Sequence, residues 1–377
     1  MLAAAIIFAD SHQEHMDELT RRRTMASIPF GGRYRLVDFA LSNLVNADIT
    51  KVAVVTQRNY QSLMDHIGSG KDWDLSRRNG GVMIFPPYSY YKNETLAENR
   101  LDYLRSVMGY ISKCQEDHIV LLDCDSVNVI DFDEVLKQHI DNNADITICY
   151  KETKITEALE NNMSFEFDKN GRVTKASLKS EVGKIANTSI NAWVVKRKLL
   201  FNLINDSIVR GAKSFRKDIL MPNVESLRMF GYRHDGVYLK INSMESYFEQ
   251  NMQMLNKDVR NQIFGENEVI YTKVRDSAPT KYGAASKVVN SYIADGCEIE
   301  GTVINSILFR GVRVGKDAVV ENSILMQDTD TGELVKLNYV ITDKNVTIRN
   351  NQTLSGCKTV PYYLSKIWWY KGEKYGK

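Results

Sequence analysis

The last third of the chain repeats a six-residue pattern, and this pattern restricts the possible folds more than any other feature. Apolar residues come as i, i+2 pairs that recur every six residues, with short Gly, Asn or Asp turns between them. Such a period is typical of a parallel β-helix, in which each turn of the solenoid stacks its inward side chains on the next. A β-sandwich of short strands is the alternative. The repeating pairs are Val312/Val314, Ala318/Val320, Ile324/Met326 and Val346/Ile348.

The first 250 residues follow a different pattern, in which apolar strands alternate with amphipathic helices. This alternation predicts a Rossmann-like, mostly parallel sheet with helices on both faces. Ligands of such sheets bind beyond the carboxyl ends of the strands. We expect helices at 36–47 and 100–114, and strands at 3–9, 51–56, 118–122, 145–150 and 190–195.

The change of pattern divides the chain into two domains. We expect an α/β domain over residues 1–255, a linker over 256–284 and a β-helix over 285–377. The linker range contains Pro279 and few periodic residues. Within the β-helix, residues 328–334 (DTDTGEL) are expected to leave the solenoid as a loop.

Charge and cysteine content exclude several classes of function. The chain has 49 basic and 47 acidic residues, a balance that argues against nucleic-acid binding and against attachment to an anionic membrane. No run approaches eighteen apolar residues and no basic leader precedes the apolar N-terminus, so neither a membrane span nor export is expected. Five scattered cysteines without C-x-x-C spacing fit reduced thiols in the cytoplasm.

Five motifs, spread over nearly the whole chain, are shared with one enzyme family. They are PFGGRYR at 29–35, HIGSGKDWDL at 66–75, FRKDI at 215–219, ESYFEQNM at 245–252 and LFRGVRVG at 308–315. In these motifs the chain resembles ADP-glucose pyrophosphorylase (glucose-1-phosphate adenylyltransferase). The resemblance implies a nucleotidyltransferase-like domain followed by a left-handed β-helix of hexapeptide repeats, assembled as a tetramer in bacterial glycogen synthesis.

The same resemblance indicates a degenerate phosphate site. Members of the family end their first strand in Gly-Gly-x-Gly-x-Arg-Leu, but here Asp10, Ser11 and Gln13 stand at the glycines and His15 at the arginine. Side chains at these positions hinder close approach of the backbone to phosphate. The family's Arg-Ala-Lys-Pro lysine is Met25 here. Transfer of a phosphoryl-type group depends on cationic stabilisation, so these losses predict a severe loss of catalysis.

The metal and sugar-phosphate positions are also altered. Asp125 falls on the family's Mg²⁺-binding aspartate, whereas Lys240 replaces the second metal aspartate. An ammonium in place of a carboxylate repels Mg²⁺, so Asp125 is interpreted either as a vestigial ligand or as a structural residue, a solvated carboxylate at the strand end or a helix cap. Mg²⁺ is expected as a cofactor only if the chain is active. The resemblance further implies Lys179 and Ser189 as sugar-phosphate contacts, with Asn191 in place of a glycine.

Together these losses resemble the non-catalytic, D-type partner subunit of the bacterial enzyme. The resemblance therefore implies a regulatory, catalytically deficient subunit that associates with a catalytic subunit in a hetero-oligomer and modulates it. The alternative is an active adenylyltransferase that makes ADP-glucose and pyrophosphate from ATP and glucose-1-phosphate. A hexapeptide-repeat acyltransferase is a weaker alternative, because no histidine that could act as a base follows His234.

One run of basic residues lies close to the former nucleotide loop. Arg21, Arg22 and Arg23 could bind a phosphorylated metabolite as an effector through bidentate contacts. The alternative is a charged surface loop without a ligand.

Overall fold

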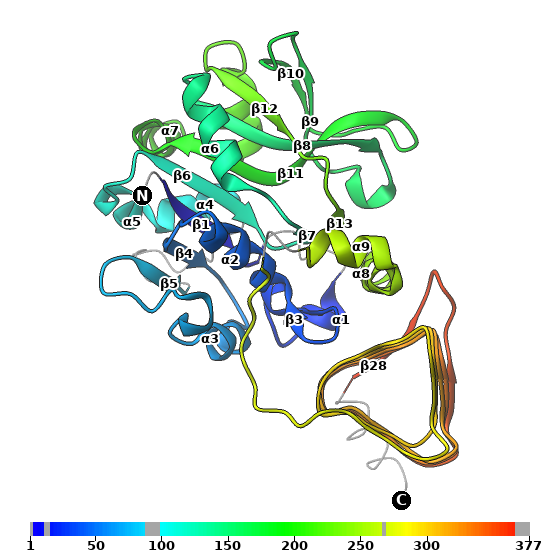
Figure 1. Cartoon of the computed structure of the whole chain (residues 1–377). Coiled ribbons are helices and arrows are strands. Elements are labelled where there is room, and N and C mark those ends of the chain that lie inside the picture. Colours follow the sequence, from blue (N-terminus) through cyan, green and yellow to red (C-terminus); the bar gives the residue numbers. More distant parts are fainter. Residues whose placement is uncertain (1–2, 11–15, 87–98, 266–268, 366–377) are drawn as a thin grey trace, which may run out of the picture.

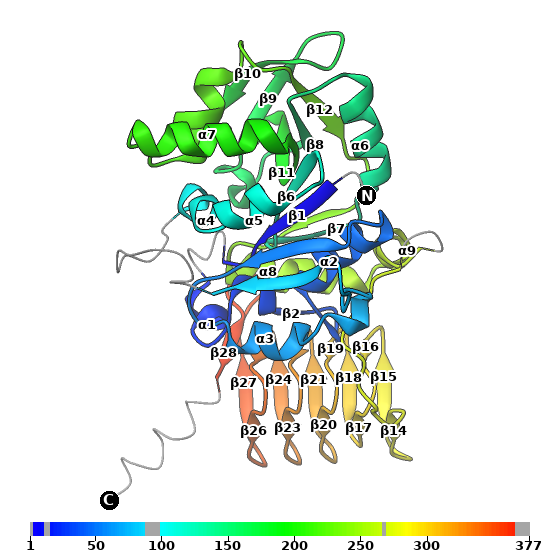
Figure 2. The ribbon, with the colours of Figure 1, turned by 90° about the vertical axis from the view of Figure 1, so that its left-hand side faces the viewer.

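The computed structural model describes residues 3–10, 16–86, 99–265 and 269–365. An α/β domain packs against a triangular β-helix, which is seen along its axis in Figure 1. Figure 2, turned by 90°, shows the strands of the β-helix side by side along one edge of the α/β domain. Within the described residues, no helix is both long enough and apolar enough to cross a membrane.

The α/β domain is built on a nine-stranded sheet. Its centre is parallel, in the order β6-β1-β4-β5, whereas β11 runs antiparallel to both β6 and β8. The sheet is therefore mixed, and the strand expected at 190–195 is part of a longer antiparallel one. The strands are β1 (Ala3–Phe8), β4 (Lys51–Val55), β5 (Gly81–Phe85), β6 (His118–Asp123), β8 (Ile146–Lys154), β9 (Ser164–Phe167), β10 (Val173–Ser177), β11 (Ile185–Lys196) and β12 (Met229–Arg233).

Helices cover both faces of this sheet, as the sequence predicts. The helices are α1 (Asp17–Thr20), α2 (Leu36–Asn46), α3 (Gln61–Ile67), α4 (Arg100–Ser106), α5 (Met108–Lys113), α6 (Phe132–Asp141), α7 (Arg197–Val209), α8 (Met244–Met252) and α9 (Lys257–Ile263). Side chains of β1 alternate between two cores: Ile6 and Phe8 pack with α4, α5 and α7, and Ala5 and Ile7 pack with α2, α3 and α6.

The prediction of one continuous helix over 100–114 is wrong. Two short helices, α4 and α5, meet at Val107, whose backbone leaves the helical region (φ −108°, ψ 18°). Val107 is fully buried in the core. Its β-branched side chain has a slightly reduced helix propensity, which agrees with a break in the helix at this residue.

Three stacks of five parallel strands form the β-helix, so the β-sandwich alternative is wrong. The predicted loop at 328–334 is also wrong, because Asp330 pairs with Arg313 inside a stack. The first stack is β14 (Lys281–Tyr282), β17 (Glu298–Ile299), β20 (Arg313–Val314), β23 (Asp330–Thr331) and β26 (Thr347–Ile348). The second is β15 (Lys287–Val289), β18 (Thr302–Ile304), β21 (Val319–Glu321), β24 (Lys336–Asn338) and β27 (Thr353–Ser355). The third is β16 (Tyr292–Ile293), β19 (Ile307–Leu308), β22 (Ile324–Leu325), β25 (Val340–Thr342) and β28 (Tyr362–Leu364).

One apolar cluster, which we call the domain seam, joins the third stack to the α/β domain. Its buried members from the α/β domain include Leu19, Met25 and Tyr247, and those from the β-helix are Ile307, Phe309, Ile324, Met326 and Ile341. Two short strand pairs lie beside the seam: β2 (Pro29–Phe30) with β3 (Tyr34–Arg35), and β7 (Ser126–Asn128) with β13 (Tyr238–Lys240).

The segment between the domains is bound along α2. The backbone N–H of Tyr271 donates to Ser42 Oγ at 2.9 Å, and Thr272 Oγ1 donates to Asp38 Oδ2 at 2.6 Å. Asn46 Nδ2 in turn donates to the carbonyl of Val269 at 3.2 Å. The range predicted as a linker, 256–284, therefore contains the helix α9, a segment without regular secondary structure that is fixed to the α/β domain, and the short strand Lys281–Tyr282 of the β-helix.

Candidate functional site

The carboxyl edge of the parallel strands carries three aspartates. Asp10 follows β1, Asp123 ends β6, and Asp125 leads into β7. Asp10 is 7% exposed, and its Oδ2 accepts hydrogen bonds from Thr56 Oγ1 at 2.8 Å and from the backbone N–H of Gln57 at 2.5 Å. These contacts tie the end of β1 to the residues that follow β4. Asp10 therefore lies where a phosphate-binding loop of the family would begin, and its carboxylate accepts hydrogen bonds from Thr56 and Gln57.

Asp123 is paired with an arginine that the sequence did not single out. Arg100, at the start of α4, places Nη2 2.5 Å from Asp123 Oδ1, and both side chains are buried. The Arg100 guanidinium lies between two aromatic rings, 4.8 Å from the centroid of Phe8 and 5.0 Å from that of Trp193. Cation–π contacts of this kind stabilise a desolvated guanidinium. Nothing in its local sequence marks Arg100, because all of its partners come from other elements.

Asp125 forms a buried ion pair with Lys240. Asp125 is 0% exposed and Lys240 is 5% exposed. Their elements are held together by the antiparallel register of β13 and β7, which sets Lys240 opposite Ser126, and by a hydrogen bond of 2.8 Å from the N–H of Ile241 to the carbonyl of Asp125. The ion pair therefore lies on a rigid backbone frame.

This donor set does not fit a divalent metal ion. Mg²⁺ requires oxygen ligands, and at Asp125 the facing group is an ammonium. Among the described residues, no group of three or more His, Cys, Asp or Glu side chains could hold a metal ion. We therefore derive no metal-assisted step for this edge.

A third cation completes the edge. Arg216, in the helical turn Phe215–Leu220, donates from Nη1 to the carbonyl of Asn161 at 3.2 Å. Burial lowers the pKa of Arg216, and repulsion from Arg100 lowers it further, whereas attraction to Asp123 and Asp125 opposes both effects. The edge thus combines Arg100, Arg216 and Lys240 with aspartates that all have protein partners.

A second polar site, the interdomain pocket, lies between the α/β domain, the segment bound along α2 and the β-helix. The space between its lining residues, together with the open solvent in front of them, is about 380 Å³. Among the described residues that line it, six are cationic and none is a carboxylate, although Arg310 pairs with Asp295 at 3.0 Å; the cations are Arg33, Arg35, Lys273, Arg275, Arg310 and Lys344. A concave site of one charge sign concentrates ions of the opposite sign. The pocket can therefore bind an anion such as a phosphoryl group.

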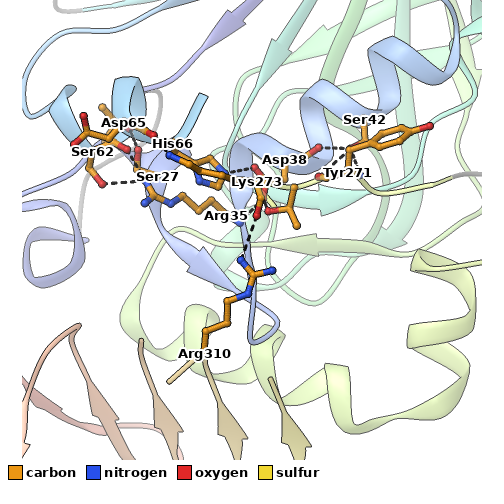
Figure 3. Close-up of polar contacts among 12 residues, drawn as sticks. Ser27, Arg35, Asp38, Ser42, Ser62, Asp65, His66, Tyr271, Lys273 and Arg310 are labelled. Atoms are coloured by element: carbon orange, nitrogen blue, oxygen red, sulfur yellow. Dashed lines mark hydrogen bonds and ion pairs between the residues drawn. The ribbon is translucent and has the colours of Figure 1, made fainter. Parts of the chain in front are cut away.

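Buried hydrogen bonds hold one wall of this pocket in place (Figure 3). Asp38, in the first turn of α2, accepts hydrogen bonds from Thr272 and, at 2.6 Å, from His66 Nε2. Arg35 donates from Nη1 to the carbonyl of Ser62 at 2.6 Å. Arg310 reaches from the β-helix to the carbonyl of Lys273 at 3.2 Å. The pocket thus connects α2, α3 and the β-helix.

Burial lowers the pKa values of three lining groups, Lys344, Arg35 and His66. Burial, and then repulsion from Arg35 and Arg23, lowers the pKa of Lys344 to about 7. Burial lowers the pKa of Arg35 to about 10, against an opposing attraction from Asp38. Burial also lowers the pKa of His66, so this ring is neutral near pH 7. A bound anion would relieve this mutual repulsion.

Comparisons with known proteins agree with this architecture. A family model described as "Nucleotidyl transferase" matches residues 4–257, and one described as "GlmU-like, C-terminal hexapeptide" matches residues 276–357. A glycogen biosynthesis protein GlgD from Bacillus subtilis is 33% identical over 96% of this chain and 95% of its own length. A GlgD protein from Geobacillus stearothermophilus is 36% identical over 84% of this chain and 82% of its own length. A glucose-1-phosphate adenylyltransferase from Clostridium botulinum is 31% identical over 85% of this chain and 83% of its own length.

The chain belongs to the ADP-glucose pyrophosphorylase family of nucleotidyl transferases. Its β-helix is accordingly the left-handed β-helix of hexapeptide repeats expected from the sequence.

Two of the positions at which the chain departs from the pyrophosphorylase pattern have structural roles. Met25 is fully buried in the domain seam. Asn191 has a left-handed backbone (φ 59°) within an irregularity of β11, a conformation that asparagine adopts more readily than most residues. Both substitutions are thus compatible with the fold.

The two positions predicted to contact sugar phosphate lie in different environments. Ser189 is buried, and its Oγ accepts hydrogen bonds from the N–H of Asn191 at 3.1 Å and from Trp193 Nε1 at 3.0 Å. Lys179 has a side chain that is 73% exposed, with Nζ 3.8 Å from Glu160. Ser189 thus forms hydrogen bonds within strand β11 of the sheet, whereas Lys179 lies at the surface. Three further predicted positions, Ser11, Gln13 and His15, lie outside the described residues.

The predicted arginine run divides into exposed and buried members. Arg21 and Arg22 are exposed, whereas Arg23 is 6% exposed and pairs with Asp343 of the β-helix at 2.5 Å. Arg23 therefore connects the two domains. The interdomain pocket, which was not predicted as a site from the sequence, is lined by more cationic residues than the arginine run contains. Three of them, Arg33, Arg35 and Arg310, belong to the motifs shared with the pyrophosphorylase family.

Proposed function

We propose that this chain is a regulatory, catalytically deficient subunit of a bacterial ADP-glucose pyrophosphorylase and that it modulates a catalytic partner subunit in glycogen biosynthesis. Similarity over nearly the whole chain to proteins named for glycogen biosynthesis supports the pathway. The free thiols of all five cysteines support a cytoplasmic location.

The observation that carries the proposal is the Lys240–Asp125 ion pair. A nucleotidyl transfer of this class needs cations placed on the phosphates, including a metal ion. At this edge two of the three cations that the chain supplies, Arg100 and Lys240, are already paired with Asp123 and Asp125. Asp125, which falls on the family's metal-binding aspartate, is thus neutralised within the protein, which supports an inactive site.

The interdomain pocket supports the regulatory part of the proposal. We propose that it binds a phosphorylated metabolite, because six cations line it, of which Arg310 is paired with Asp295, and guanidinium and ammonium groups match several phosphate oxygens. Binding there would act on both domains at once, since the lining residues come from each. The partner is proposed to be the catalytic subunit of the same enzyme, in a hetero-tetramer.

Assays of ADP-glucose pyrophosphorolysis test the proposal. The purified chain, the catalytic subunit from the same cell and their mixture are assayed over a range of effector concentrations. We expect no turnover by the chain alone, and a changed substrate affinity or effector response in the mixture. A matched mixture containing the Arg33→Ala/Lys344→Ala variant is expected to keep complex formation and lose the changed effector response.

The second candidate function, an active glucose-1-phosphate adenylyltransferase, is favoured by the relatives that carry that name. It predicts Mg²⁺-dependent turnover by the isolated chain that is abolished by Asp125→Asn. Robust turnover of that kind would replace the regulatory proposal. An inactive chain that neither binds nor alters the catalytic subunit would also contradict it.

A further inference from the structure

The ion pair at the carboxyl edge raises a question about stability that is separate from catalysis. Asp125 is fully buried and is held near its partner by β7 and β13, which lie side by side at the centre of the molecule (Figure 1). A buried carboxylate is strongly unfavourable unless a cation or several hydrogen bonds compensate its charge. The fold therefore requires a cation at this point, whatever the chain does in the cell.

The β13 strand allows only one direction for the Lys240 side chain. Successive side chains of a strand point to opposite faces. Leu239 packs into the domain seam with Val127, so Tyr238 and Lys240 face the other way, toward Asp125. Both are largely buried; Asn162 Nδ2 donates to Tyr238 Oη at 3.2 Å. Lys240 is thus directed at Asp125 by the strand itself.

The neighbouring charges are balanced in the same way. Asp123 pairs with Arg100 at 2.5 Å, and Asp10 accepts hydrogen bonds from Thr56 and Gln57. Arg216 lies close enough to Asp123 and Asp125 to be attracted by both. Within the described part of the edge, three cationic side chains, Arg100, Arg216 and Lys240, therefore accompany the three aspartates.

We propose that Lys240 is the resident cation of this site: its ammonium occupies the charge-balancing place next to Asp125, keeps divalent metal ions out and makes the fold of the α/β domain independent of metal. This inference concerns metal binding and stability, so it holds or fails separately from the regulatory role proposed above.

Thermal unfolding and Mn²⁺ binding of the full-length chain test this proposal. Mn²⁺ serves as the probe because its binding is measured directly by electron paramagnetic resonance. For the unsubstituted protein we expect no bound Mn²⁺ at the edge and the same unfolding temperature in Mn²⁺ and in EDTA. Lys240→Met should lower that temperature by on the order of 10 °C, because it removes the cation that is paired with the buried Asp125. The double variant Asp125→Asn/Lys240→Met should recover much of the loss.

Two further variants make the test specific. Lys196→Met removes another lysine that pairs with an aspartate, Asp145, but there Arg228 remains at 2.8 Å as a second partner. This control should lower the unfolding temperature much less than Lys240→Met. Lys240→Asp should create a site that binds Mn²⁺ and should unfold at a higher temperature with Mn²⁺ than with EDTA.

Three results would overturn the proposal. The first is Mn²⁺ binding by the unsubstituted protein that disappears in Asp125→Asn. The second is a Lys240→Met protein that unfolds at the same temperature as the Lys196→Met control. The third is a folded Lys240→Asp protein that takes up no Mn²⁺, since Lys240 would then not be the group that excludes the metal. Where Lys240→Asp does not fold, the comparison of Lys240→Met with its double variant decides.

Discussion

The backbone of Arg23 lies in the α/β domain, between α1 and the turn Met25–Ser27, but its guanidinium contacts the β-helix. There it pairs with Asp343 at 2.5 Å and lies 3.9 Å from Met326 Sδ. Asp343 also accepts the backbone N–H of Lys344 at 2.8 Å, so the ion pair is directly next to a residue of the interdomain pocket. One side chain thus links the former nucleotide loop region, the β-helix and the pocket.

Replacement of Arg23 tests the importance of this link. Because both partners are buried, Arg23→Met should lower the free energy of unfolding by about 3–5 kcal/mol, which chemical denaturation measures. The exposed neighbour Arg21 provides the matched control, and Arg21→Met should unfold like the unsubstituted protein. Equal stability of the two variants would contradict the structural role of Arg23.

Arg23 also marks a limit of sequence-based prediction. Three consecutive arginines are equivalent in the sequence, and only the packing of domains separates the buried one, whose partner lies 320 residues away. Lys240 differs, because a family pattern defines its position relative to Asp125 even without a structure. Arg100 belongs neither to a run of basic residues nor to a family pattern. Its contacts with Asp123, Phe8 and Trp193 depend on the sheet register and on where α4 begins.

Among the elements, the β-helix shows a corner built from stacked asparagines. Asn290 Nδ2 donates to Asn305 Oδ1 at 2.7 Å, and Asn322 Nδ2 donates to Asn338 Oδ1 at 2.9 Å. Asn305 and Asn322, joined at 3.5 Å, both have a left-handed backbone (φ 46°). Asparagine here serves twice, by adopting the turn conformation and by bonding to the coils on either side.

A pair of substitutions separates these two roles. Asn322→Ala removes the stacked hydrogen bonds and also strains the backbone, so we expect a loss of about 2–3 kcal/mol in the free energy of unfolding. Asn345→Ala, at a corner with φ 56° that is not part of this stack, should suffer mainly the strain and lose about 1 kcal/mol. Chemical denaturation measures both, and a loss at Asn345 as large as that at Asn322 would contradict a contribution from the stack.

The regular elements were the most predictable part of the chain. The six-residue period predicts the β-helix because each inward pair must stack on the next, and the apolar run at the N-terminus predicts β1. The prediction of one helix at 100–114 was wrong, because the helical spacing of apolar residues continues through Val107 whereas the helical backbone conformation is interrupted there. The loop expected at 328–334 failed because polar residues such as Asp330 also occupy outward positions of a coil.

For the molecule as a whole, the interdomain pocket should respond to pH through Lys344. In the folded chain its pKa is lowered from 10.5 to about 7. Between these values the unfolded chain binds more protons at Lys344 than the folded chain does. The contribution of Lys344 to stability therefore rises with pH from about 7 to about 10.5 and is lowest below this window, where the crowded ammonium is charged.

Anion binding should show the opposite dependence, because it uses the charged form. Sulfate is a suitable probe, since its own charge is constant in this range. We expect its affinity to fall roughly 5-fold between about pH 6 and about pH 8.5, measured by the sulfate-dependent shift of the unfolding temperature. Lys344→Arg should keep the affinity and lose the pH dependence. Sulfate binding that is the same at both pH values in the unsubstituted chain would contradict the role of Lys344.

The domain seam has a consequence for how such chains can diverge. Its apolar side chains and the Arg23–Asp343 pair come from both domains, so each domain alone would expose apolar side chains and an unpaired charge at the boundary. A recombination event that exchanged the β-helix between two relatives would bring together mismatched halves of one core. Inheritance of the two domains as a single unit is therefore the route that preserves the fold, and a hybrid protein built for the laboratory would need its junction placed so that both halves of the seam come from the same parent.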